Sequence, residues 1–235
     1  MSDIWTIMWK EWKDSLFQGW RAWIRPGLLI GILGIIWPVL GKSAWMDLSV
    51  IQMVVILFFT FFVIISIVAD SIAGERERHT LGTLLASRIS DRAILLGKVT
   101  IVALYGWGIM VVGLFLGALV SNLADWQGQF VFYPIDMVLF TLLLGLLVGA
   151  LGTILGVLIS LRMATVRQAQ QTLMIGTIVL GVAVIGLVQL LPKDFFTTFT
   201  LDEILLMAAG LVAVLDVLLL GFTLARFQRA KLILS

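Results

Sequence analysis

The sequence predicts an all-helical protein that crosses a membrane several times. Of its 235 residues, 61% are hydrophobic and 13% are charged, whereas ordinary soluble domains have about 45–50% and about 25%. The mean hydropathy is +1.11. This excess of apolar residues is too large for one globular core, and it excludes a soluble enzyme, a disordered chain and a nucleic-acid-binding protein. The chain has no cysteine, so thiol catalysis and disulfides are also excluded.

Six apolar segments are candidates for membrane spans, each of which needs about 20 mainly apolar residues. The first is short and is interrupted by glycines and Pro38, and it gains length if it includes Ile24. The other five are long and nearly free of charge. We therefore expect residues 24–235 to form one six-span transmembrane domain. The six segments comprise residues 26–40, 48–69, 99–120, 137–160, 172–191 and 204–224.

The basic residues predict the orientation of these spans. With six spans, fourteen of the sixteen Lys and Arg residues fall on one side, and Lys42 and Lys193 fall on the other. Cytoplasmic loops carry the excess of basic residues, so both termini are expected in the cytoplasm. Without the first span, ten basic residues would lie opposite six, which is a poorer separation.

Residues 1–23 are expected to form an amphipathic helix that lies in the membrane interface. Its tryptophans and Leu16 recur at intervals of three and four residues, which places them on one helical face. Polar residues such as Lys10 and Arg21 fall on the opposite face, in water. A core-packing helix of a soluble cap is the less favoured alternative. The tryptophans are Trp5, Trp9, Trp12, Trp20 and Trp23.

Residues 70–98, between the second and third spans, read DSIAGERERHTLGTLLASRISDRAILLGK. Leucines at positions i, i+3 and i+4 follow a charged run, and this pattern predicts an amphipathic helix. Ser90 is a candidate N-cap, and Asp91 is favourable at the positive end of a new helix. That helix would continue through Lys98 into the third span.

This segment resembles the signature of type-two ABC exporter permeases. There the second span is followed by a glutamate/arginine run, a Thr-Leu pair, a leucine-rich stretch, a serine turn and Gly-Lys. The resemblance extends along the chain through the six spans, the cytosolic termini and the Trp-rich first helix, and it is weaker at residues 158–171. His79 and Gly82 stand where the family usually has glycine and glutamate. The matching residues are Ala73, Gly74, Glu75, Arg76, Glu77, Arg78, Thr80, Leu81, Leu84, Leu85, Ser90, Gly97 and Lys98.

The resemblance implies the permease subunit of an exporter in a bacterial or archaeal cytoplasmic membrane. Residues 70–98 would contain the coupling helix, which seats in a groove of a cytosolic ATPase, and a second contact is expected around Arg162 and Arg167. Two ATPase subunits with ATP and Mg²⁺, and a second copy of the chain or a related permease, would complete the transporter. A solvated charge run on an interfacial helix is the alternative for this segment.

No nucleotide or metal site is expected in the chain itself. Gly41-Lys42-Ser43 has the end of a phosphate-binding loop, but Ile36 stands where the earlier glycine is required. His79 is the single histidine, so no histidine-based metal cluster can form. We expect the chain to perform no covalent chemistry.

Asp216 is the one ionisable residue inside a predicted span, where it costs about 3 kcal/mol on insertion scales. It would either face a translocation path or form a structural hydrogen bond to another helix, and the second is favoured. Its charge leaves open a secondary transporter driven by an ion gradient, and a non-transporting scaffold is a third class. The candidate pathway residues are Gln52, Thr60, Ser66 and Asp216.

Four glycines of the fourth span fall on one helical face, because they recur at intervals of four, three and four residues. Small residues in this arrangement let two helices approach closely. Packing within the chain is favoured over a seam between two copies. The glycines are Gly145, Gly149, Gly152 and Gly156.

Overall fold

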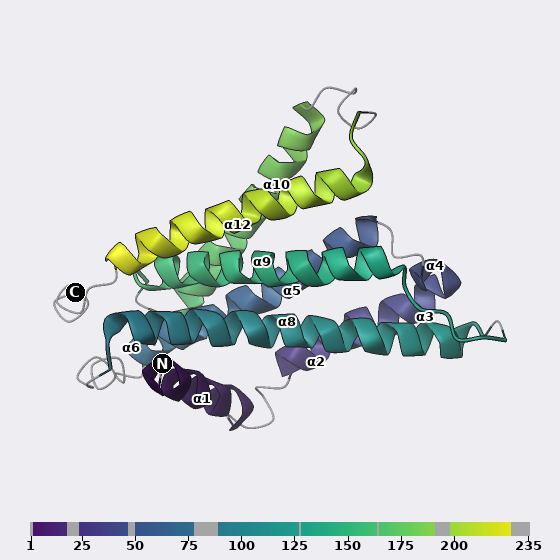
Figure 1. Ribbon diagram of the computed structural model, residues 1–235. Helices are drawn as coiled ribbons and strands as arrows, with labels where there is room; N and C mark the ends of the chain where they lie inside the picture. The colour runs from purple at the N-terminus through teal and green to yellow at the C-terminus, as the bar shows by residue number, and fades with distance from the viewer. Residues whose placement is uncertain are drawn as a thin grey trace.

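The computed structural model describes residues 2–17, 24–46, 50–77, 89–126, 128–163, 165–190 and 198–226. Within these ranges the regular structure is entirely helical, as the sequence predicted (Figure 1). Among the described residues, four helices are long and apolar enough to cross a membrane. They are α5 (Val50–Ala69), α8 (Asp91–Ala124), α9 (Ile135–Ser160) and α12 (Leu201–Arg226).

The predicted boundaries of these helices agree well with the structure. The bounds of α5, α9 and α12 lie within three residues of the predicted 48–69, 137–160 and 204–224. Helix α8 begins at Asp91 because Ser90 caps it, and the Ser90 hydroxyl accepts a hydrogen bond from the backbone N–H of Ala93 at 3.3 Å. The third span is thus the end of one continuous helix of 34 residues. Helix α10 (Val166–Leu190) covers the predicted segment 172–191 apart from its last residue.

The first apolar segment is a broken helix. It consists of α2 (Ile24–Gly31), the π-helical turn η2 (Ile32–Ile36) and α3 (Trp37–Gly41), and α4 (Ser43–Met46) follows. In the π turn the N–H of Trp37 donates to the carbonyl of Ile32, and Pro38 follows directly. Proline has no N–H to continue the ladder. The apolar stretch Pro26–Gly41 is shorter than the four long helices, so six spans remain a prediction.

Helix α9 lies at the centre of the bundle. It packs between α12 and α8, with α5 on the remaining side (Figure 1). Helix α1 (Ser2–Phe17) packs along one end of α8, near α6 (Glu75–Glu77). We call this the inner end of the bundle, following the predicted orientation. The outer end carries α3, α4 and the connection of residues 125–134 between α8 and α9 (Figure 1).

The glycine face of α9 is filled by side chains of the same chain. A Cβ atom built on Gly152 would lie 2.5 Å from the Phe61 ring, and one built on Gly149 would lie 3.0 Å from Ile64. A side chain at either position would therefore force its neighbour to shift, so the glycines allow α9 to pack closely on α5. The pairs are Gly145 with Met110 of α8, and Gly149, Gly152 and Gly156 with Ile64, Phe61 and Val68 of α5.

Candidate functional site

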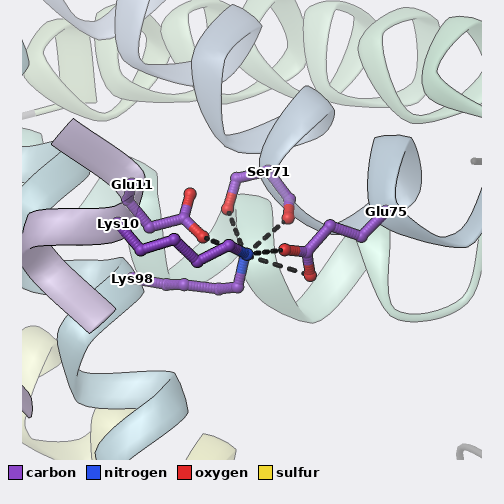
Figure 2. A network of polar contacts seen from close by, with 5 residues as sticks. All are labelled: Lys10, Glu11, Ser71, Glu75 and Lys98. Atoms are coloured by element: carbon purple, nitrogen blue, oxygen red, sulfur yellow. Dashed lines mark hydrogen bonds and ion pairs between the residues drawn. The ribbon is translucent and has the colours of Figure 1, made fainter. Parts of the chain in front are cut away.

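A buried lysine stands at the inner end of α8. The side chain of Lys98 is 3% exposed, and a buried ammonium group is costly unless it is paired. Its Nζ donates to Glu11 Oε1 at 2.7 Å and to the Ser71 carbonyl oxygen at 2.7 Å, and Glu75 Oε2 lies 3.2 Å away. Figure 2 shows these groups converging on the Lys98 nitrogen. Every donor direction of the ammonium group therefore has an acceptor nearby.

A second lysine completes the cluster. Lys10 Nζ lies 2.7 Å from the other carboxylate oxygen of Glu75 and 3.7 Å from Glu11 Oε1. Two lysines and two glutamates balance in formal charge. Because the Lys10 side chain is 43% exposed, water screens its ion pair with Glu75 more than it screens the contacts of Lys98. We call Lys10, Glu11, Ser71, Glu75 and Lys98 the inner network.

The inner network joins three parts of the chain. Helix α1 supplies Lys10 and Glu11, and α8 supplies Lys98. Ser71 lies in the π-helical turn η3 (Asp70–Gly74), and Glu75 begins α6, where the predicted coupling segment starts. Single π-helical turns are rare and often occur at functional sites. The first helix is therefore bonded directly to the start of the segment that the sequence assigned to coupling.

An apolar contact beside the network brings α1 close to α8. Ile7 is 2% exposed, and a Cβ built on Gly97 would lie only 2.7 Å from its Cγ2 atom. The rings of Trp12 and Tyr105 also meet edge to face, with centroids 6.2 Å apart. The absence of a side chain at Gly97 thus allows α1 to approach the backbone of α8.

The interfacial position of α1 stays a prediction, and these contacts add that the helix also packs on α8. The helix buries Ile7 and Glu11 against α8, because Lys98 offers that carboxylate a partner inside the protein. The tryptophan side chains remain accessible, because Trp5, Trp9 and Trp12 are 65%, 53% and 40% exposed even though Trp12 contacts Tyr105. Trp20 and Trp23 lie outside the described residues.

A second link ties the coupling segment to α10. Glu77 Oε2 accepts a hydrogen bond from the backbone N–H of Val166 at 3.1 Å, and the Thr165 hydroxyl accepts one from Gln168 at 3.3 Å. A carboxylate is favourable at the positive end of a helix. The Gln170 side chain also donates to the Ser66 carbonyl at 3.4 Å. The exposed side chains of Arg162 and Arg167 lie in the same region.

Part of the predicted coupling site cannot be placed. The side chain of Arg76 and the whole of Arg78, Thr80, Leu81, Leu84 and Leu85 lie outside the described residues. Of the predicted glutamates, Glu75 belongs to the inner network and Glu77 caps α10. In the described part of the chain, no three metal-ligating side chains come together.

An apolar cavity of about 310 Å³ lies between the first apolar segment, α5 and α10. Of the four predicted pathway residues, Ser66 lines this cavity. Thr60 instead is buried and donates to the Ile56 carbonyl at 2.8 Å. Both carboxylate oxygens of Asp216 are buried, and among the described residues they have no hydrogen-bond partner. The other lining residues are Leu28, Ile32, Phe59, Phe62, Val63, Ile65, Gln170 and Met174.

A comparison with known protein families identifies the family of this chain. The family model described as "ABC-2 family transporter protein" matches residues 47–202. The chain belongs to the ABC-2 transporter family. The matched residues include α5, the coupling segment, α8, α9 and α10. A comparison with curated proteins gives no significant match.

Membership of the ABC-2 family makes this chain an integral membrane protein, the permease of an ABC transporter. The family also implies an ABC ATPase as its partner. Three members of the inner network, Ser71, Glu75 and Lys98, lie inside the matched region. Lys10 and Glu11 precede it, and sequence analysis did not select either as a site residue. A usable signal existed, because Ile4, Ile7 and Glu11 recur at helical spacing on a face that the tryptophans do not occupy.

Proposed function

We propose that this chain is one half of an ABC exporter, with six spans, both termini in the cytoplasm and a second permease copy completing the pathway. Two cytosolic ATPase subunits dock on the segment 75–85 and on the connection around Arg162 and Arg167. ATP binding closes the ATPases, and this movement rearranges the two membrane halves. Membership of the ABC-2 family does not favour a transporter driven by an ion gradient.

The observation that carries the proposal is the inner network. It bonds α6, where the coupling segment begins, to α1 and α8 through the 2.7 Å and 3.2 Å contacts of Lys98. A force applied to the coupling segment therefore reaches α1 through the charge-assisted hydrogen bond from Lys10 to Glu75, and it reaches α8 through the ion pair of Glu75 with Lys98. Movement of a docked ATPase would be transmitted as a rigid-body displacement.

Glu77 extends this connection to α10. Its 3.1 Å bond to the Val166 N–H places the start of α10 against the coupling segment. The start of the coupling segment is thus joined to the start of α10 at the inner end, and the two proposed ATPase contacts would move together. Further along α10, Gln170 and Met174 line the apolar cavity, which we propose as part of the pathway for an amphipathic or lipid-like cargo.

The proposal is tested by reconstituting the chain with the ATPase that co-purifies with it from native membranes. The chain alone should hydrolyse no ATP, and the complex should hydrolyse ATP and export cargo from the cytoplasmic side. Deletion of residues 81–85 should abolish transport while membrane insertion and ATP hydrolysis by the free ATPase persist. Transport that is unchanged by the deletion would contradict the coupling assignment. ATP hydrolysis by the purified chain would contradict the assignment of hydrolysis to a separate ATPase subunit.

A further inference from the structure

The connection between α8 and α9 turns back and lies beside α8. Asn122 of α8 holds Val131, because its Nδ2 donates to the Val131 carbonyl at 2.8 Å and its Oδ1 accepts from the Val131 N–H at 2.8 Å. The next residue, Phe132, meets Phe115 of α8 with ring centroids 6.0 Å apart. Phe115 lies nine residues before Ala124, the end of α8, which is about 14 Å along the helix. The returning chain therefore reaches well below the end of α8.

Phe115 marks the depth of this contact in the membrane. It lies inside the predicted third span, residues 99–120, about 8 Å from the outer end of that span. Val112, Phe115 and Leu119 recur at intervals of three and four residues and are 47%, 62% and 49% exposed. An exposed apolar stripe on a membrane span is the side that faces lipid. Because the Phe132 ring rests on Phe115, it lies at a similar depth.

The side chains of the returning segment alternate in exposure. Phe130 and Phe132 are 56% and 41% exposed, Val131 between them is half-buried, and Tyr133 is 3% exposed. Alternation of this kind is typical of an extended chain, and a residue that precedes proline, as Tyr133 precedes Pro134, favours extended backbone. One side of the segment therefore packs on the protein, and the two phenylalanines lie on the other.

The polar groups of the segment suit a position away from water. Backbone at membrane depth must find its hydrogen-bond partners within the protein, and Asn122 satisfies both the N–H and the carbonyl of Val131. Pro134 has no N–H, and its carbonyl accepts from the Val138 N–H at 3.0 Å. Residues 126–135 also carry no charged side chain. These features lower the cost of moving the segment out of water.

We propose that residues 130–134 lie within the outer leaflet beside α8, and that Phe130 and Phe132 bind the acyl chains of its lipids. The lipid-facing stripe of α8 is continuous with the two exposed rings, so the same lipids cover both. In amphipathic helices of the interface, Phe, Trp and Leu side chains are buried by about 5–10 Å, and the depth of Phe115 falls in this range. This assignment requires that α8 spans the membrane, and it is independent of the cargo and of the ATPase.

Site-directed spin labelling of the full chain in phosphatidylcholine vesicles tests the proposal. The chain has no cysteine, so a nitroxide can be attached at one chosen residue. Power saturation compares collisions of the label with oxygen, which concentrates in hydrocarbon, and with a water-soluble nickel chelate. The label in Phe132→Cys should collide mainly with oxygen, as should the label in Leu119→Cys on the lipid-facing stripe. Gln129→Cys is the matched control, because Gln129 is an exposed polar residue of the same connection.

The ratio of oxygen to nickel collisions should be several-fold higher at position 132 than at position 129. Phe130→Cys supplies the same measurement if Phe132→Cys fails to fold, since Phe130 is exposed on the same side of the segment. Labels at positions 130 and 132 that collide mainly with nickel would overturn the proposal, because the segment would then lie in water. Labels shielded from both reagents would also overturn it, because protein, such as a second copy of the chain, would then cover the two rings.

Discussion

The ammonium nitrogen of Lys98 and a carboxylate oxygen of Glu11 lie 2.7 Å apart, although 87 residues separate the two positions in the chain. This contact fastens the first helix to the start of the third predicted span, and Glu75 joins it from the coupling segment at 3.2 Å. The pair is buried, so removal of either member leaves a charge that water cannot reach. The strongest predictions therefore concern this contact.

Replacing Lys98 with methionine should strongly destabilise the protein. The variant leaves two buried carboxylates without their main cation, and breaking a buried ion pair in this way costs about 3–5 kcal/mol. Chemical unfolding in detergent measures the change. Lys42→Met is the matched control, because Lys42 is exposed and, within the described part of the chain, forms no ion pair. A loss of stability that is equal in both variants would contradict the role of the inner network.

The same variant should release α1 from α8. The chain has no cysteine, so Ile7→Cys introduces a single reactive group at a position that is 2% exposed. Maleimide should react slowly with this cysteine while α1 is docked and faster when Lys98→Met is added. Similar reaction rates with and without Lys98→Met would show that apolar contacts alone hold the helix.

Gly97→Ala should weaken the docking of α1 by steric overlap. Its Cβ would lie 2.7 Å from Ile7, and forcing such a contact costs about 1–3 kcal/mol. Gly108→Ala on the same helix is the control, since nothing lies within 4 Å of its Cβ position. Adding Ile7→Ala removes the Cγ2 contact and leaves the Ile7 Cβ at 2.8 Å, so it should relieve the overlap in part, which a double-mutant cycle measures as coupling. Additive effects of the two substitutions would contradict the contact.

Replacing Glu77 with glutamine should affect coupling more than stability. The amide oxygen can still accept from the Val166 N–H, but the charge that favours the start of α10 is lost, which is worth less than about 1 kcal/mol at an exposed site. We expect normal unfolding and a lower amount of cargo moved per ATP in the reconstituted complex. Glu203→Gln is the control, because Glu203 makes a similar bond to the Thr200 N–H at the start of α12. An equal loss of transport in both variants would argue against a specific role for Glu77.

Asp216→Asn should not destabilise the protein. The two carboxylate oxygens of Asp216 are buried, and within the described residues no hydrogen bond holds them. Removing the charge of this carboxylate from a span therefore relieves part of an insertion cost of about 3 kcal/mol. Thermal unfolding should shift upward or stay unchanged, and ATP-driven transport should persist. Loss of transport in a variant of normal stability would instead assign Asp216 to the pathway.

The sequence predicted the long helices well because continuous apolar runs and a serine cap are local signals. Ser90 marks the start of α8, and the bounds of α5 and α9 follow from where the apolar residues begin and end. Glycines and Pro38 likewise mark the first apolar segment as interrupted. Each of these features depends on a few neighbouring residues, so no tertiary contact was needed to find them.

The inner network could not be predicted in the same way. Lys98 was part of a recognised motif, but nothing local indicates that its partner is Glu11, since the pairing depends on how α1 packs across α8. The tryptophan pattern correctly identified an apolar face of α1 that is exposed in the structure. It gave no information on the face that carries Ile7 and Glu11. The apolar cavity also depends on the packing of three segments, and only Ser66 of its lining had been selected.

Helix α8 is longer than the hydrocarbon core of a membrane is thick. Its 34 residues extend about 50 Å at about 1.5 Å per residue, whereas the hydrocarbon core of a bilayer measures about 30 Å. Lys98 lies near one tip and Gly117 lies about 30 Å away towards the other. A tilt of α8 set by the coupling segment would consequently be felt at the other end of this helix, where Leu33, Trp45 and Tyr133 surround Gly117.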